Sequence, residues 1–101
     1  MEYNKLVRDK IPEIIIKNNQ KPFTHVASDE EYLSKLKEKL REEVDEFLEV
    51  ENIEEMADIL EVIASINDSK NWNENKIVEI RVAKREKHGG FKNKIILERV
   101  E

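Results

Sequence analysis

Two long amphipathic segments with almost no linker between them constrain the fold of this chain most strongly. Residues 28–50 and 52–68 both place apolar side chains at helical spacing, and only Glu51 separates them. A connection this short makes consecutive helices antiparallel neighbours. The sequence therefore predicts a central helix hairpin. On the first helix the apolar stripe consists of Leu33, Leu36, Leu40, Val44 and Phe47.

Two shorter helices are expected on either side of this hairpin. One spans about residues 8–18, and its regular part begins near Ile11, because Pro12 is tolerated only in a first helical turn. The other spans about residues 74–88 and ends at Gly89, a residue type that often terminates helices. Four helices in one short chain indicate an all-α fold.

The C-terminal segment has a different pattern. Residues 91–100 are partly β-branched and alternate weakly in polarity, which predicts a short strand. The expected fold is thus a four-helix bundle with a central antiparallel hairpin and a short β-like tail. At 101 residues the chain is expected to form one domain over residues 1–101.

Four acidic residues recur at a three-residue spacing on the central hairpin. They are Glu43 and Glu46 in REEVDEFLE, and Glu55 and Asp58 in EEMADILEV. A three-residue step puts both members of a pair on the same side of a helix. The hairpin brings the end of the first helix beside the start of the second, so the four carboxylates converge. Hard cations bind such oxygen ligands, and we predict a Mg²⁺ site here, with Mn²⁺ as the alternative ion.

The helical wheel distinguishes these four acids from their acidic neighbours. At about 100° per residue, Glu43 falls on one shoulder of the first apolar stripe and Glu46 lies farther from it. Glu55 lies inside the apolar arc of the second helix, and Asp58 lies just beyond its edge. A carboxylate within an apolar arc is costly unless it is paired, protonated or bound to a metal ion.

Three simpler explanations of the acids remain open at this point. Charged residues make up 41% of the chain, so acidic pairs at helical spacing also arise by chance. Glu55 follows Asn52 by three residues, which fits a variant capping box without any metal. The acids could also form interhelical salt bridges with lysines such as Lys39.

Composition excludes several classes of protein. The absence of cysteine excludes a disulfide framework and a thiolate metal site. No apolar run reaches the roughly 18 residues of a membrane span. The net charge of −5 argues against binding of a nucleic-acid polymer. The first ten residues lack the apolar core of a signal peptide, so we expect a cytoplasmic protein.

The second helix of the hairpin is apolar over roughly 220° of its circumference. A helix that is apolar most of the way round is usually buried on several sides. We therefore expect a homodimer or homotetramer with the hairpin at its centre. The alternative is a monomeric bundle in which this helix lies in the middle.

The order ExxE then ExxD on consecutive helices is similar to that of the all-α nucleoside triphosphate pyrophosphohydrolases. These include MazG-like proteins, dimeric dUTPases and phosphoribosyl-ATP pyrophosphohydrolases. YNKLVRDKIPEII near the start resembles the opening segment of a phosphoribosyl-ATP pyrophosphohydrolase-like subgroup. KREKHGGF followed by KNKIILERV resembles the closing segment of that subgroup. Together these stretches touch most of the chain.

This resemblance implies Mg²⁺-dependent hydrolysis of a nucleoside triphosphate between its α and β phosphates. It implies that Glu43, Glu46, Glu55 and Asp58 are the metal ligands. Glu43 and Glu46 are the expected catalytic residues, with Glu46 as the first candidate for a general base. The expected phosphate-binding residues are Lys5, Arg8, Lys10, Lys84 and Arg85.

Nothing in the sequence identifies a phosphoribosyl-ATP pocket, so we expect a role in nucleotide-pool house-cleaning rather than a biosynthetic step. No residue indicates which base is preferred. Two other classes of function stay open. The chain could be a regulatory protein that binds a nucleotide through Mg²⁺ without cleaving it. It could also be a non-enzymatic helical oligomerisation module.

Overall fold

The computed structural model describes residues 4–101, and this part of the chain contains four α-helices and no strand. It divides into two compact units, one ending at Asn71 and the other spanning Trp72–Glu101. The all-α fold class is confirmed. The single domain and the four-helix bundle stay predictions. No described helix is both long enough and apolar enough to cross a membrane.

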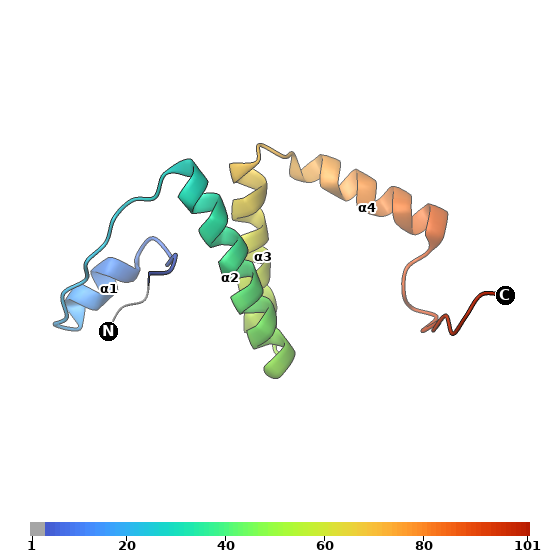
Figure 1. The fold of residues 1–101 in the computed structure, drawn as a ribbon, viewed down its shortest axis with the longest axis horizontal. Helices are drawn as coiled ribbons and strands as arrows, with labels where there is room; N and C mark the ends of the chain where they lie inside the picture. The colour runs from blue at the N-terminus through green and yellow to red at the C-terminus, as the bar shows by residue number, and fades with distance from the viewer. Residues whose placement is uncertain (1–3) are drawn as a thin grey trace. The chain divides into compact units, whose positions relative to one another are not determined.

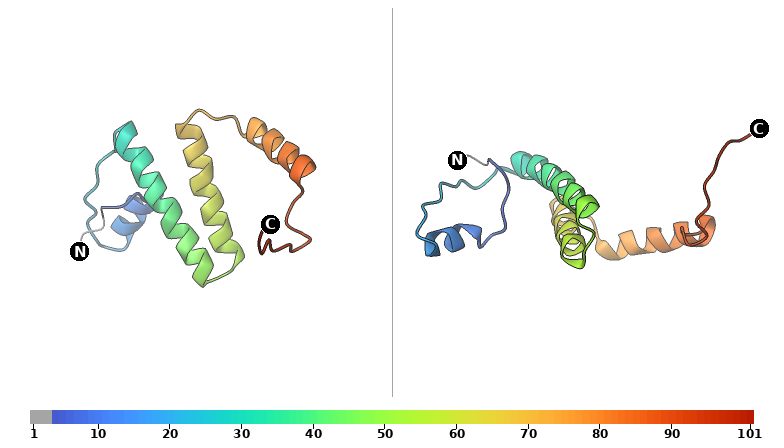
Figure 2. Two further views of the ribbon diagram at one scale, coloured as in Figure 1. Left: turned by 45° about the vertical axis from the view of Figure 1, so that its right-hand side comes forward. Right: turned by 90° about the horizontal axis from the view of Figure 1, so that it is seen from below.

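The first unit is built on the predicted antiparallel hairpin (Figure 1). Helix α2 spans Asp29–Glu49 and helix α3 spans Ile53–Ser69, so both ends of each helix lie within one residue of the prediction. The two helices lie side by side in extended contact, and the view on the left of Figure 2 shows them running in opposite directions. The Oγ atom of Ser28 accepts a hydrogen bond from the Glu31 backbone N–H at 3.2 Å, which caps α2.

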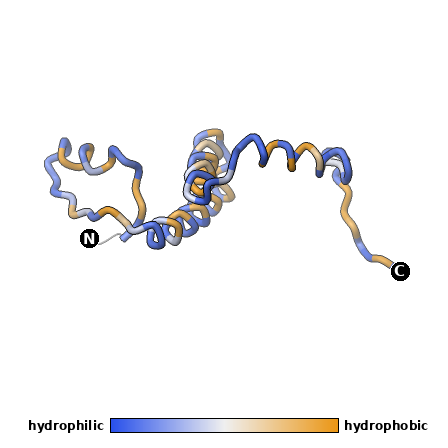
Figure 3. Tube along the Cα trace, turned by 90° about the horizontal axis from the view of Figure 1, so that it is seen from above, coloured by the Kyte–Doolittle hydropathy of each residue, from blue (hydrophilic) through white to orange (hydrophobic). Residues whose placement is uncertain are grey.

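The apolar core of the hairpin is small. Leu36 on α2 is 2% exposed and Val62 on α3 is 8% exposed, and these are the buried apolar residues of the described chain. The tube in Figure 3 shows apolar residues interspersed with polar ones along the hairpin. The rest of the predicted α2 stripe is half-buried: Leu33, Leu40, Val44 and Phe47.

The N-terminal segment of the first unit contacts the hairpin before helix α1 begins. Helix α1 spans Ile11–Lys17 with Pro12 in its first turn, as predicted. Upstream of it, Lys5 forms an ion pair with Glu42 of α2 at 3.6 Å. This contact places the N-terminal segment beside the part of α2 that contains Glu42 and Glu43.

The second unit consists of helix α4 and the tail. Helix α4 spans Glu74–His88, and the Oδ1 atom of Asn73 caps it by accepting the Asn75 backbone N–H at 2.8 Å. Gly89, with φ of +85°, follows the last helical residue. A positive φ is strained for residues with a Cβ atom, so glycine suits this helix end.

The predicted strand in residues 91–100 is wrong. The tail contains a turn and extended backbone but no strand. A strand needs a neighbour for its backbone hydrogen bonds, and the described residues contain no other strand. Moreover, Ile95, Ile96 and Leu97 are three consecutive apolar residues, each at least 77% exposed, so no face of the tail is distinctly apolar.

Candidate metal centre

Three carboxylates from α2 and α3 converge close to the hairpin connection. Glu43, Glu55 and Asp58 each offer one oxygen atom, and these atoms all lie within 4.8 Å of one another. Glu43 belongs to the last turns of α2, and the other two residues belong to the first turns of α3. The antiparallel packing brings the end of α2 beside the start of α3, so acids from both helices share one site.

The carboxylate oxygens of this cluster lack the partners that burial requires. Glu43 is only 7% exposed, and Glu55 and Asp58 are half-buried. The Oε2 atoms of Glu43 and Glu55 are buried without a hydrogen-bond partner, and no other described side chain has such an atom. Burial of an unpaired carboxylate is costly. The negative charge of the cluster is therefore only partly balanced, and a cation would stabilise it.

The helix cap does not account for Glu55. The Oδ1 atom of Asn52 accepts the Glu55 backbone N–H at 2.9 Å, which is one half of a capping box. The other half is missing, because the Asn52 backbone N–H donates to the Val50 carbonyl at 2.9 Å. The cap therefore uses the backbone of Glu55 and leaves its carboxylate for another purpose.

Lysine pairing also accounts for only part of the cluster. The Nζ atom of Lys39 lies 3.6 Å from the Oε1 atom of Glu43 and 3.7 Å from the Oε2 atom of Glu42. Both pairs lie within α2, whereas the salt-bridge explanation requires Lys39 to pair across the two helices. Lys39 offsets part of the charge of Glu43, and the Oε2 atom of Glu43 stays without a partner.

The proximity of these acids alters their protonation. Burial is the main reason why the pKa of Glu43 is raised above its ordinary value, followed by the negative charge of Glu46. Loss of solvent also raises the pKa of Glu55, and Glu46 and Asp58 add to the effect. The nearby carboxylate of Glu46 therefore favours the protonated forms of Glu43 and Glu55.

Glu46 is therefore close to the cluster although it is not one of the three converging ligands. Glu46 is exposed, whereas the other three predicted ligands are buried or half-buried. An exposed carboxylate beside a metal centre is able to exchange protons with water. This position suits the role of general base predicted for Glu46 better than the role of a ligand.

The structure brings one of the predicted phosphate-binding residues to the cluster. The Nη2 atom of Arg8 donates to the Oδ1 atom of Asp58 at 2.9 Å. Lys5 pairs with Glu42, and Lys10 is exposed at the start of α1. The other two predicted residues, Lys84 and Arg85, lie on α4 in the second unit.

A cavity of about 250 Å³ adjoins the cluster. Tyr32 of α2 and Ser65 of α3 line this cavity, and we did not predict either of them from the sequence. Tyr32 precedes Glu43 by eleven residues and Ser65 follows Asp58 by seven, and both steps return to the same helical face, so the spacing contained the signal. The full lining comes from the N-terminal segment (Leu6, Val7, Arg8, Asp9), α2 (Tyr32, Leu36, Lys39, Glu43) and α3 (Asp58, Glu61, Val62, Ser65).

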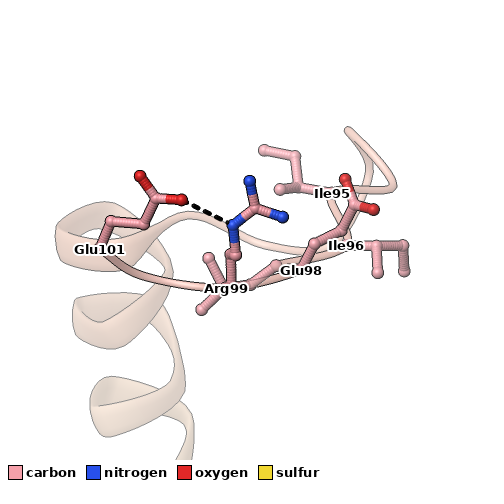
Figure 4. A pocket seen from close by; sticks show the side chains of 6 residues that line it. Ile95, Ile96, Glu98, Arg99 and Glu101 are labelled. Atoms are coloured by element: carbon pink, nitrogen blue, oxygen red, sulfur yellow. Dashed lines mark hydrogen bonds and ion pairs between the residues drawn. The ribbon is translucent and has the colours of Figure 1, made fainter.

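The tail of the second unit has a second hollow, shown in Figure 4. Its charged groups partly satisfy each other, because the Nε atom of Arg99 donates to the Oε1 atom of Glu101 at 2.9 Å. Both side chains are more than three-quarters exposed. This hollow contains no buried polar atom in need of a partner, so it is a weaker candidate than the acidic cluster.

The donor set of the cluster fits a hard divalent cation. Carboxylate oxygens are the ligands that Mg²⁺, Mn²⁺ and Ca²⁺ accept, whereas thiolates and imidazoles, typical of softer metals, are absent from the cluster. Glu43, Glu55 and Asp58 are the residues that could hold such an ion. Comparisons of this chain with protein-family models, with curated proteins and with solved structures find no match.

Proposed function

We propose that this chain is a Mg²⁺-dependent nucleoside triphosphate pyrophosphohydrolase. It would cleave between the α and β phosphates, giving a nucleoside monophosphate and pyrophosphate. The main supporting observation is the buried carboxylate of Glu43, whose Oε2 atom has no partner although acids from α3 lie within 4.8 Å. The sequence resemblance of the ExxE and ExxD pairs to the all-α pyrophosphohydrolases supports the choice of reaction.

The residues of the cluster divide into complementary roles. Glu43, Glu55 and Asp58 would hold the ion, which when bound offsets charge on phosphate oxygens and lowers the pKa of a bound water. Glu46 would accept a proton from the attacking water. The water oxygen bonds to phosphorus as the bridging bond between the α and β phosphates breaks, and pyrophosphate leaves. No protein nucleophile is required.

A house-cleaning role in the cytoplasmic nucleotide pool is our proposal for the biological context. Arg8 and Lys39 line the cavity beside the cluster and could bind phosphate oxygens, which every nucleoside triphosphate carries. Such a site would accept several nucleoside triphosphates. A substrate panel of common and damaged nucleotides is therefore the appropriate assay.

We also propose that the chain assembles into a homodimer or homotetramer through α3. Four apolar residues of this helix are exposed and follow one another at steps of three, four and three, the spacing of a helix–helix seam. Their exposed fractions are 83% for Ile53, 40% for Met56, 57% for Leu60 and 38% for Ile63. With two buried apolar residues described, the hairpin would gain further stability from covering this seam.

Pyrophosphate release with Mg²⁺ tests the reaction, with Glu43→Gln as the key variant. This change keeps the size of the side chain and removes its charge, so we expect the Mg²⁺-dependent rate to fall at least about a hundredfold, in the range that loss of a metal-site group costs. Glu49→Gln is the matched control, because Glu49 is exposed on the same helix and lies outside the cluster. Its rate should equal that of the unmodified chain.

Other outcomes would favour the other two functions. Metal-dependent nucleotide binding without pyrophosphate release would indicate a regulatory nucleotide-binding protein. Thermal stability that responds neither to Mg²⁺ nor to nucleotide would indicate an oligomerisation module. Equal rates for Glu43→Gln and the unmodified chain would contradict the role of the cluster.

A further inference from the structure

Arg8 forms an ion pair with Asp58, one of the candidate ligands of the metal centre. Its guanidinium donates to the Oδ1 atom of Asp58 at 2.9 Å, across 50 residues of sequence. The Arg8 side chain is 60% exposed and that of Asp58 is 39% exposed. An ion pair this exposed adds little to stability, so folding alone gives a weak reason for its position.

We propose that Arg8 is the resident cation of the metal centre and is exchanged for a divalent ion. In the exchange, the guanidinium leaves Asp58 and binds the polyphosphate of a nucleotide in the adjoining cavity. This inference rests on the proposed function, because it needs a centre that binds both a metal ion and a polyphosphate. It adds an order of binding, in which the metal ion precedes the nucleotide.

The charges of the cluster favour such an exchange. Lys39 pairs with Glu43 and Arg8 pairs with Asp58, whereas Glu55 has a buried oxygen without a partner. Two monovalent cations thus offset three converging carboxylates incompletely. A divalent ion among the same oxygens would repel the guanidinium at short range.

The unpartnered Oε2 atom of Glu43 is the independent sign of a ligand. This residue is more than nine-tenths buried, and neither Arg8 nor Lys39 satisfies that atom. A cation that reached it would also lie among the Glu55 and Asp58 oxygens, since all three groups lie within 4.8 Å. The space that a divalent ion needs therefore adjoins the carboxylate that Arg8 now holds.

The structure also gives Arg8 a destination. Arg8 lines the same cavity of about 250 Å³ as Glu43 and Asp58. A planar guanidinium binds phosphate oxygens as well as carboxylate oxygens through the same pair of N–H donors. Arg8 lies just before the turn that leads into α1 and outside any helix, so its side chain is able to change partner without disturbing a helix.

The test measures metal binding and nucleotide use separately in Arg8→Gln. Calorimetric titration with Mn²⁺ alone, without nucleotide, should show tighter binding by about fivefold, the size of an exposed ion pair. In the pyrophosphate assay, with the metal ion in excess, the KM for the nucleoside triphosphate should rise about tenfold or more, as expected when a charged hydrogen bond is lost. These two shifts have opposite signs, and a purely structural role of Arg8 would not produce both.

Two further variants serve as controls. Arg41→Gln removes the same charge from an exposed position on α2 that lies about 200° around the helix from Glu43, and neither quantity should change. Arg8→Lys keeps the charge and loses the planar donor pair. It should leave Mn²⁺ affinity near that of the unmodified chain and raise only the KM.

The possible results separate this inference from the proposed function. Unchanged or weaker Mn²⁺ binding by Arg8→Gln, in a chain that does bind Mn²⁺, would overturn the exchange alone. Failure of the unmodified chain to bind Mn²⁺ would overturn both proposals. Tighter Mn²⁺ binding by Arg8→Gln, with weaker nucleotide binding but no hydrolysis, would support the exchange and contradict the hydrolase.

Discussion

At the residue scale, Glu43 and Glu55 would couple the proposed metal binding to proton binding. Each has a pKa above its ordinary value of 4.5 because it is desolvated and lies near other acids. The folded chain therefore holds these protons more tightly than the unfolded chain does. Their contribution to stability is complete below about pH 4.5 and is lost as the pH rises through the raised pKa values.

This linkage predicts opposite pH trends with and without metal. As the pH rises from about 4.5 through the raised pKa values of Glu43 and Glu55, the metal-free free energy of unfolding should lose the contribution of these two acids. The stabilisation by Mg²⁺ should grow over the same range, because the ion replaces the protons. Denaturant unfolding at several pH values, with and without Mg²⁺, measures both trends.

The variant Glu43→Gln isolates the contribution of one group. Glutamine does not titrate, so the difference in stability between the two chains should change with pH only where Glu43 does. A metal-free difference that favours the unmodified chain increasingly as pH rises would contradict the raised pKa. Mg²⁺ stabilisation that is independent of pH would contradict the exchange of protons for metal.

At the element scale, the N-cap of α3 connects folding of the hairpin to formation of the metal centre. Asn52 fixes the first turn of α3 by binding the backbone N–H of Glu55, the residue whose carboxylate enters the cluster. Loss of this cap should let the first turn fray and let Glu55 move. The stability of a secondary-structure end and the geometry of a ligand are thus set by one side chain.

We predict that Asn52→Ala lowers both the stability and the metal affinity. The free energy of unfolding should fall by about 1 kcal/mol, the usual cost of losing an N-cap, and calorimetry should show weaker Mn²⁺ binding. Ser28→Ala is the matched control, because Ser28 caps α2 at the end opposite to Glu43. It should lower stability by a similar amount and leave the metal affinity unchanged, so equal losses of affinity in both variants would contradict the prediction.

The success of sequence-based prediction at this scale depends on how local each interaction is. The ends of α2 and α3 are predictable because Ser28 and Asn52 bind backbone groups three residues away. The convergence of Glu43 with Glu55 follows from helical spacing and one short connection. The contact of Arg8 with Asp58 spans 50 residues, and no periodicity in the sequence indicates it.

The exposed position of Glu46 shows a further limit. The three-residue spacing puts Glu46 on the same side of α2 as Glu43, and the wheel places it farther from the apolar stripe. Which of the two meets α3 depends on the rotation of the helices against each other. The rotation that the structure shows buries Leu36, Val62 and Glu43 and leaves Glu46 exposed beside the cluster.

At the scale of the whole molecule, the apolar seam of α3 predicts association of chains. Leu60 lies in the middle of this seam and is 57% exposed. Leu60→Lys should reduce the mass in light scattering to that of one chain, because a charge in an apolar interface is strongly disfavoured. Val26→Lys is the control, because Val26 is 98% exposed in the loop before α2 and lies outside the seam. A monomeric unmodified chain would contradict the proposed assembly.

At this scale the sequence indicates that the apolar arc of α3 packs against another element. It does not identify that element. The broad apolar arc of α3 was predicted, and the structure leaves Ile53, Met56, Leu60 and Ile63 exposed on it. An arc of this kind is equally compatible with another copy and with another helix of the same chain. The predicted strand in residues 91–100 is wrong for a related reason, because a β-like sequence pattern does not provide the neighbouring strand that its backbone hydrogen bonds require.

The compact placement of the acids along the chain has a practical consequence for protein engineering. All four acids, from Glu43 to Asp58, lie on two consecutive helical ends joined by a few residues. A cassette of these residues would transfer the three candidate ligands, together with Glu46, to another scaffold with a single graft. The recipient would need only an apolar surface that shelters the second helix.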